Sequence, residues 1–211
     1  MLELGVGTGI VAQALHAYGR QPLGVDIAAA MLARAHQRLG PRVAQYDGRR
    51  LPFRDAAFAA AYAVWVMHLV EDQEGVLREL ARVLRPGGRF VIEPLNYRAD
   101  DEIERITWPM LQALLGERAG RDDLDRLSGL ADSAGLLVVG RVPGRRLKLR
   151  TTAAQEVATI ERRDAAIYWD LDEERWREVV EPALDRLRAL GDYEVERDAW
   201  HELLVLEREA G

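Results

Sequence analysis

Short apolar runs alternate along the chain with segments in which apolar residues recur three and four positions apart. The runs are typical of buried strands, and the periodic segments are typical of the helices that cover them. Strands are expected at residues 2–4, 22–26, 43–46, 59–64, 89–93, 136–142 and 199–206. Helices are expected between them at residues 10–17, 28–39, 73–84 and 121–134. This alternation predicts an α/β fold with a seven-stranded, mostly parallel sheet and helices on both faces.

Glycine and proline mark the ends of several of these elements. Pro86 is expected to end the helix at 73–84, and Gly87 and Gly88 to form a tight return before the strand that begins at Arg89. Residues 145–150 alternate apolar and basic side chains, and we interpret them as an extension of the strand at 136–142.

Two further segments, residues 95–119 and 151–197, interrupt the alternation and have helical periodicity. Thr152 and Asp172 are candidate helix caps in the second segment. We expect one domain, residues 1–211, with these two helical insertions near the carboxyl ends of the strands. There they would form a lid over a substrate pocket, or they would complete a core or a dimer face.

Three glycines, Gly5, Gly7 and Gly9, follow the first strand at alternate positions. Glycine permits left-handed backbone angles and close approach of a ligand. The loop joins a strand end to a helix start, which is where nucleotide-like ligands bind in open α/β sheets. Asp26 ends the second strand, where a carboxylate accepts hydrogen bonds from ribose hydroxyls. A glycine-rich turn that binds nothing is the alternative.

These residues resemble the first two motifs of class I S-adenosylmethionine (SAM)-dependent methyltransferases. The family's acidic glycine loop matches Glu3, Gly5, Gly7 and Gly9, and its second-strand acid matches Asp26. Later stretches also resemble the family, with Asp47 in the third-strand loop, the segment 61–70, and the Pro-Gly-Gly signature within 79–93. The resemblance covers about residues 1–94, and it implies a Rossmann-like sheet whose last strand is antiparallel.

The resemblance also implies the cofactor, SAM, and its product, S-adenosylhomocysteine. It places the loop glycines against the amino-acid part and the ribose, Glu3 on the ammonium directly or through water, and Asp26 on the ribose hydroxyls. Asp47 would accept a hydrogen bond from the adenine amino group, with Gly48 beside it giving room. Ile27, Val64 and Trp65 complete the expected cofactor-binding set.

The acceptor side of the site is less defined, because the methyl group of SAM is already activated and a catalytic base is optional. His68, after the fourth strand, is the candidate catalytic base, and a pocket wall is the simpler interpretation. Glu93 and Tyr97, after the fifth strand, could face the acceptor. Tyr168 and Trp169, in the second insertion, would suit a flat acceptor or belong to a core.

Two departures from the family pattern keep an alternative open. Ala59 stands where the family usually has an acid, and Met1 already lies in the first strand, so the family's leading segment that covers the cofactor is expected to be absent. Both favour a non-catalytic module that binds SAM or its product, or a degenerate partner subunit. A nicotinamide or nucleotide-sugar enzyme is disfavoured by Ile10, which stands where the dinucleotide fingerprint has its third glycine.

Composition narrows the function further. The 211 residues carry a formal charge of −6, which argues against a general nucleic-acid partner. No apolar run approaches a membrane span, there is no cysteine, and the four histidines lack metal-ligand spacing. Lys148 is the only lysine beside many arginines, which suggests a bacterial, GC-rich genome. We expect a cytoplasmic methyltransferase of the ubiquinone/menaquinone-biosynthesis type that acts on a small molecule, with a homodimer left open.

Overall fold

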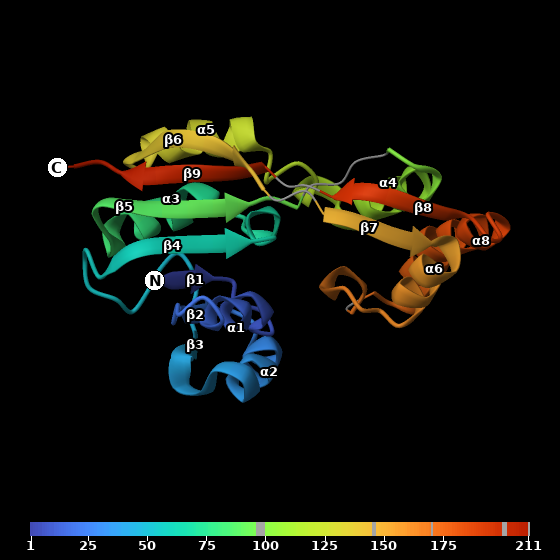
Figure 1. Ribbon diagram of the computed structural model, residues 1–211, viewed down its shortest axis with the longest axis horizontal. Helices are drawn as coiled ribbons and strands as arrows, with labels where there is room; N and C mark the ends of the chain where they lie inside the picture. The colour runs from blue at the N-terminus through green and yellow to red at the C-terminus, as the bar shows by residue number, and fades with distance from the viewer. Residues whose placement is uncertain (96–99, 145–146, 170, 200–201, 211) are drawn as a thin grey trace. The chain divides into compact units, whose positions relative to one another are not determined.

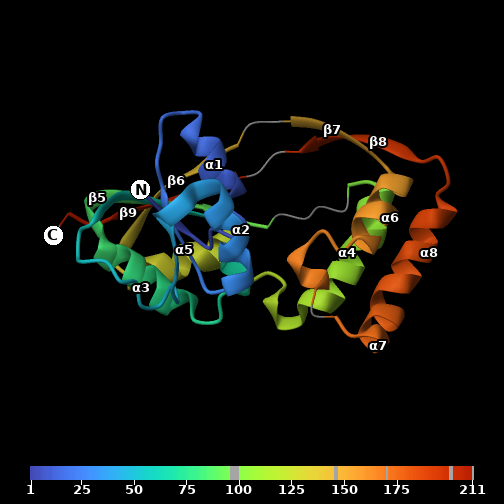
Figure 2. The same ribbon diagram turned by 90° about the horizontal axis from the view of Figure 1, so that it is seen from below.

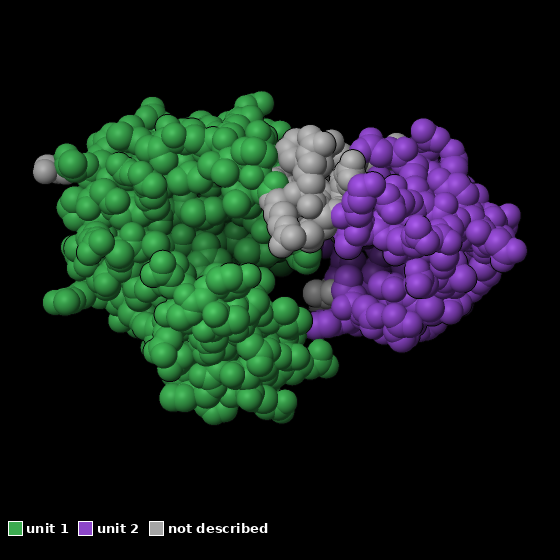
Figure 3. All heavy atoms as spheres, in the orientation of Figure 1, with its two compact units in different colours: residues 1–95, 120–144, 202–211 green, residues 96–119, 145–201 purple. Residues whose placement is uncertain are grey.

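The computed structural model describes residues 1–95, 100–144, 147–169, 171–199 and 202–210. The chain divides into two compact units, shown in different colours in Figure 3. The first unit comprises residues 1–95, 120–144 and 202–211, and the second comprises residues 96–119 and 145–201. Each unit has a hydrophobic core of its own.

The first unit is built on a seven-stranded sheet with the strand order β3-β2-β1-β4-β5-β9-β6 (Figure 1). The strands are β1 (Leu2–Leu4), β2 (Leu23–Asp26), β3 (Val43–Gln45), β4 (Phe58–Val64), β5 (Leu84–Glu93), β6 (Leu136–Pro143) and β9 (Glu202–Arg208). Strands β1 to β5 pair in parallel, and β9 runs antiparallel to both β5 and β6. The predicted Rossmann-like sheet with an antiparallel last strand is therefore confirmed.

Helices cover both faces of this sheet (Figure 2). The helices are α1 (Ile10–His16), α2 (Ala29–Leu39), α3 (Gln73–Val83) and α5 (Leu124–Ser133), with short 3-10 turns at Gly40–Arg42 (η1) and Met67–Leu69 (η2). Apolar residues of α3 and α5 pack against β4, β5 and β9 to form the main core. Apolar residues of α1 and α2 form a smaller cluster around Val6. Asp72 and Asp123 cap α3 and α5 by accepting hydrogen bonds from backbone N–H groups, as helix starts require.

The boundary between α3 and β5 differs from the prediction. The helix ends at Val83, three residues before Pro86, and β5 already begins at Leu84, which pairs with Phe58 of β4. The pairing then shifts register between Phe58 and Ala60, so the Pro-Gly-Gly stretch lies within the strand as an irregularity. Gly87 has a φ of 70°, which explains the glycine there.

The second unit packs helices against one another beside a two-stranded ribbon. Its elements are α4 (Glu102–Leu115), η3 (Gly116–Arg118), β7 (Leu147–Thr152), α6 (Ala153–Glu161), η4 (Ala166–Tyr168), α7 (Glu173–Arg175), the π-helix η5 (Trp176–Val180), α8 (Glu181–Ala189) and β8 (Glu194–Ala199). Thr152 caps α6 in a capping box with Gln155, and Asp172 caps α7. Both caps were predicted. The helical segment that follows Asp172 contains the π-helix η5 between α7 and α8.

Two strand predictions were wrong in this region. Residues 147–152 do not extend β6 but form β7, which pairs with β8 in a separate antiparallel ribbon. The last strand of the main sheet begins at Glu202, because Ala199 ends β8 instead. Opposite charges face each other across the ribbon, with Lys148 Nζ 2.7 Å from Glu196 Oε1. Such cross-strand pairs stabilise an exposed ribbon.

Candidate functional site

The three loop glycines between β1 and α1 all adopt left-handed backbone angles, with φ values of 67°, 53° and 81° for Gly5, Gly7 and Gly9. A Cβ atom at Gly5 would overlap the side chain of Val66. A Cβ atom at Gly7 would meet nothing within 4 Å. The loop is therefore packed tightly on one side and has open space at its middle glycine, as a ligand cradle requires.

Asp26 holds this loop in place from the end of β2. Its Oδ2 accepts a hydrogen bond from the Gly7 N–H at 2.8 Å, and its Oδ1 accepts one from the Ala28 N–H at 2.8 Å. Each carboxylate oxygen can accept more than one hydrogen bond, so both still have capacity for donors from a ligand. The structure thus brings Asp26 and the glycine loop together.

Large apolar side chains are exposed directly after the carboxyl ends of three strands. Ile27 follows β2, Tyr46 follows β3 and Trp65 follows β4, and these side chains are 66%, 40% and 49% exposed. Ile10, at the start of α1, is 62% exposed. Exposed apolar residues gathered at the carboxyl edge of a parallel sheet indicate a binding site. The sequence prediction included Ile27 and Trp65 but missed Tyr46 and Ile10.

Trp65 has an unusual backbone. Its φ of 56° lies in the left-handed region, which is rare for a bulky residue, and its N–H donates a hydrogen bond to the Glu93 carbonyl at 3.0 Å. Val64 and Glu93 are paired residues at the ends of β4 and β5. Strain of this kind persists where the surroundings enforce it, and it is concentrated at functional sites.

Glu3 is buried in β1 beside β4. Its Oε2 accepts a hydrogen bond from the Tyr62 hydroxyl at 2.8 Å. Burial raises the pKa of Glu3 to about 7, and the negative charge of Asp26 acts in the same direction. Burial and the neighbouring Glu3 also raise the pKa of Tyr62. In the part of the chain that the structure describes, no cationic side chain pairs with Glu3, so its buried carboxyl group is suited to meet a positive charge.

Asp47 already has a partner on the protein. The Arg49 side chain donates to both carboxylate oxygens, with 3.0 Å from Nε to each oxygen. These hydrogen bonds lower the pKa of Asp47. At Gly48, an added Cβ would lie 2.9 Å from Leu4 Cδ1, so the missing side chain makes room for the core residue Leu4.

His68 lies in η2, after β4, and its side chain is nearly buried. Its Nδ1 is 3.5 Å from Oδ2 of Asp122, and the same Oδ2 accepts the Leu95 N–H at 2.6 Å. Asp122 is itself buried. The sequence prediction missed Asp122, because no local spacing connects it with a histidine so far away in the chain.

Of the remaining predicted substrate residues, Tyr168 and Trp169 lie in the second unit, and Glu93 ends β5 in the first unit. Tyr168 is buried in the core of the second unit, with its ring centroid 6.2 Å from that of Trp176. Trp169 is half-exposed, and its Nε1 donates to the Arg163 carbonyl at 2.7 Å. Tyr97 lies outside the described residues. The substrate roles of Tyr168, Trp169, Tyr97 and Glu93 stay predictions.

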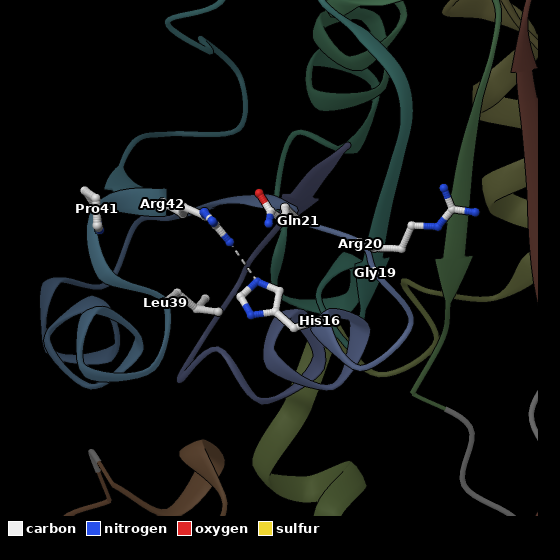
Figure 4. A pocket seen from close by; sticks show the side chains of 7 residues that line it. All are labelled: His16, Gly19, Arg20, Gln21, Leu39, Pro41 and Arg42. Atoms are coloured by element: carbon white, nitrogen blue, oxygen red, sulfur yellow. Dashed lines mark hydrogen bonds between the residues drawn. The ribbon is translucent and has the colours of Figure 1, made fainter.

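A separate hollow of about 440 Å³ lies where α1 and α2 end, beside the residues that precede β2 and β3 (Figure 4). It is lined by His16, Gly19, Arg20, Gln21, Leu39, Pro41 and Arg42. Arg42 donates a hydrogen bond to His16 Nε2 at 3.1 Å, whereas the Arg20 side chain extends away from this pair (Figure 4). This hollow is distinct from the glycine-loop site. Within the described residues no cluster of side chains is suited to a metal ion, and no helix has the length and hydropathy to cross a bilayer.

A comparison with family models matches residues 2–92 to the methyltransferase domain. This part of the chain is similar to methyltransferase domains. The matched residues include the glycine loop, Asp26, Asp47 and His68. The resemblance predicted from the sequence motifs is thereby confirmed.

Curated relatives and solved structures are also similar to this chain. A demethylmenaquinone methyltransferase of Mycolicibacterium paratuberculosis is 39% identical over 92 residues, which are 44% of this chain and 40% of the relative. The chain thus matches less than half of the length of this relative. The YcgJ protein of Bacillus subtilis has a TM-score of 0.65 at 20% identity, over all of this chain and 92% of that one. A Galdieria sulphuraria protein described as a sarcosine dimethylglycine methyltransferase has a TM-score of 0.62 at 18% identity. The match covers 99% of this chain and 77% of that one. At these identities, the solved structures show the fold.

Proposed function

We propose that the chain binds SAM at the carboxyl edge of its sheet and transfers the methyl group to a small-molecule acceptor by direct displacement. The observation that carries this proposal is the left-handed glycine loop held by Asp26 and faced by exposed apolar side chains. The match of residues 2–92 to the methyltransferase domain also supports the proposal.

The residues of the site fit the parts of SAM. The open space at Gly7 allows close backbone approach, and the oxygens of Asp26 can accept the ribose hydroxyls. The buried carboxyl group of Glu3 would meet the ammonium group directly or through water. Ile27, Val64 and Trp65 would contact the apolar surfaces of the nucleoside and the methionine chain.

Asp47 would accept the adenine amino group only if it shares its oxygens with Arg49 or if Arg49 moves. Substituting Arg49 by Ala is therefore expected to strengthen binding of S-adenosylhomocysteine, whereas substituting Asp47 by Ala weakens it. Calorimetric titration of the two variants compares these effects. Equal affinity in both variants and in the unaltered chain would remove Asp47 from the site.

SAM, when bound, would supply a methyl group, and the electron pair of the methyl–sulfur bond would stay on sulfur as the acceptor forms its new bond. A neutral acceptor that carries a hydrogen then gives up one proton. The protein's own contribution is to align the acceptor and exclude water. His68 would take up the proton if the acceptor needs a base.

The acceptor is proposed only as a small molecule. The family model matches residues 2–92, which lie before both insertions, and the mycobacterial relative matches 44% of this chain. We infer that the insertions at about 95–119 and 151–197 form a substrate lid of one methyltransferase domain. The half-exposed Trp169 offers an aromatic surface there. We also propose that the chain forms a homodimer and acts in the cytoplasm.

The experiment is a methyl-transfer assay on the purified chain with SAM labelled in its methyl group. The acceptor panel contains demethylmenaquinone, simple phenols, amines and carboxylic acids. The proposal predicts labelled product, and equimolar S-adenosylhomocysteine, with at least one acceptor. Micromolar cofactor binding without transfer to any acceptor would favour the non-catalytic alternative. Stabilisation by NAD but not by SAM would overturn the cofactor assignment.

A further inference from the structure

A buried polar network in the first unit joins η2, the start of α3 and the residues before α5. Gln73, the first residue of α3, is almost fully buried. Its Nε2 donates to the Met67 carbonyl at 2.9 Å and to the Arg121 carbonyl at 2.7 Å. Arg126 in turn donates from Nε to the Gln73 Oε1 at 3.2 Å.

The two carbonyls that Gln73 joins belong to the residues directly before His68 and Asp122. Gln73 therefore holds the backbone next to His68 and the backbone next to Asp122. Asp122 is fixed a second time by the Leu95 N–H, just past the end of β5. Buried hydrogen bonds of this kind hold the groups that they join in one geometry.

The imidazole ring of His68 lacks a hydrogen-bond partner at its Nδ1 atom. Among the described residues, two buried side-chain polar atoms lack a hydrogen-bond partner, and they are Nδ1 of His68 and Nη1 of Arg121. Leaving a buried polar atom unpaired is costly. The closest acidic oxygen to Nδ1 is Oδ2 of Asp122 at 3.5 Å, which is beyond hydrogen-bond length but within reach of a small movement.

We infer that Asp122 and Gln73 are positioning residues that set the tautomer of His68, with the proton on Nδ1 and the lone pair on Nε2. A lone pair on Nδ1 would face the lone pairs of the Asp122 carboxylate and be repelled, whereas an N–H there is attracted. The inference rests on the proposed function, because the bare Nε2 serves a purpose only if the acceptor of the methyl group releases a proton. The proton then passes from Nε2 to water, and Asp122 stabilises the charged ring in the interval.

Nitrogen NMR of the histidine rings tests the tautomer without an acceptor. The protein is labelled with nitrogen-15 in histidine, and the His68→Gln variant identifies the signals of His68. At a pH where the ring is neutral, we expect a protonated Nδ1 and a bare Nε2. In Asp122→Ala the ratio of the two tautomers should shift toward Nε2–H by about tenfold, because a hydrogen bond to a charged group is worth at least that much.

Asp123 supplies the matched control. It is the neighbouring acid, it is exposed, and it caps α5, so Asp123→Asn should leave the His68 signals unchanged. If Asp122→Ala does not fold, Asp122→Asn carries the test, and a smaller shift in the same direction is expected. A His68 that carries its proton on Nε2 in the unaltered chain, or that does not respond to either Asp122 variant, would overturn the inference.

Titration with S-adenosylhomocysteine separates this inference from the proposed function. Asp122→Ala should bind it within about twofold of the unaltered chain, because Asp122 acts on the acceptor side. Loss of binding in the unaltered chain would refute the proposed function whatever the tautomer. Intact binding with the wrong tautomer would refute only the positioning role.

Discussion

The two faces of the seven-stranded sheet carry different kinds of residues at neighbouring positions of the same strands. On the face that packs against α3 and α5, the row Leu4, Ala63, Ile92 and Leu204 is apolar and buried throughout. On the opposite face, the adjacent row begins with Glu3 and Tyr62, continues with half-buried Val91 and Val205, and reaches Gly140 on β6. Farther along that face, Leu137 is 44% exposed.

This difference separates stability from function. The apolar face buries area that drives folding. The opposite face contains the buried acid Glu3 and, beyond the strand ends, a strained tryptophan and exposed apolar residues. Each of these features costs free energy in the unliganded chain, as functional sites commonly do. The following substitutions test this separation, from the largest expected effect to the smallest.

Phe90 and Val91 are neighbours on β5 that point to opposite faces of the sheet. Phe90 is fully buried, so Phe90→Ala should lower the free energy of unfolding by about 3–5 kcal/mol. Val91 is only half-buried, and Val91→Ala should cost about 1 kcal/mol or less. Urea denaturation of both variants measures the difference. Equal losses would show that the faces do not differ in this way.

Glu3 should make the stability depend on pH. Its pKa is about 7 in the folded chain against 4.5 without burial, so folding favours the protonated form. The stability that this adds is present below pH 4.5 and is lost as the pH rises through 7, by on the order of 3 kcal/mol. Glu3→Gln keeps an acceptor for Tyr62 but has no charge, so it should be more stable than the unaltered chain at pH 8 and similar to it at pH 4.5.

Urea midpoints at the two pH values check this prediction. Asp125, an exposed acid of α5, offers a control, because Asp125→Asn should leave the shape of the pH profile unchanged. If Glu3→Gln and the unaltered chain follow parallel profiles, the carboxyl group of Glu3 is not destabilised by burial.

Substituting Trp65 should affect ligand affinity more than stability. Trp65→Gly relieves the left-handed backbone but removes the contacts of the indole, so the free energy of unfolding should change by only about 1 kcal/mol. Affinity for S-adenosylhomocysteine should fall severalfold, because the exposed indole is lost from the site. Unfolding and calorimetry on the same variant measure both. A variant that loses stability but keeps its affinity would make Trp65 a structural residue only.

Leu137 should matter least. It lies on the exposed part of the sheet face, so Leu137→Thr should change the free energy of unfolding by no more than about 0.5 kcal/mol. Thermal unfolding with Leu136→Ala as the comparison is the measurement, because the neighbouring Leu136 is buried. A large loss at Leu137 would mean that this face is covered in solution.

The sequence predicted those features that depend on neighbouring residues. The strands that end at Leu4 and Asp26 were recognisable, because a short apolar run that leads into glycine or an acid is a local pattern. The caps Thr152 and Asp172 were recognisable for the same reason, since a cap and its helix are adjacent in the chain.

Features that depend on distant partners were not predictable. The alternation in β7 is correct for a strand, but nothing local indicates that it pairs with β8 rather than with the main sheet. Likewise, the early start of β5 depends on the pairing of Leu84 with Phe58. Asp122 was missed because its relation to His68 exists only after the chain has folded. The hydrogen bonds from Arg49 to Asp47 could have been anticipated from their spacing of two residues.

The central claim is that the glycine loop and Asp26 bind a sulfonium nucleoside. Calorimetric titration of the purified chain with S-adenosylhomocysteine tests it most directly, with Asp26→Ala and the near-isosteric Asp26→Asn measured alongside. The account predicts micromolar binding by the unaltered chain, a loss of at least about tenfold in Asp26→Ala, and a smaller loss in Asp26→Asn. Absence of binding by the unaltered chain, or equal affinity in all three proteins, would contradict it.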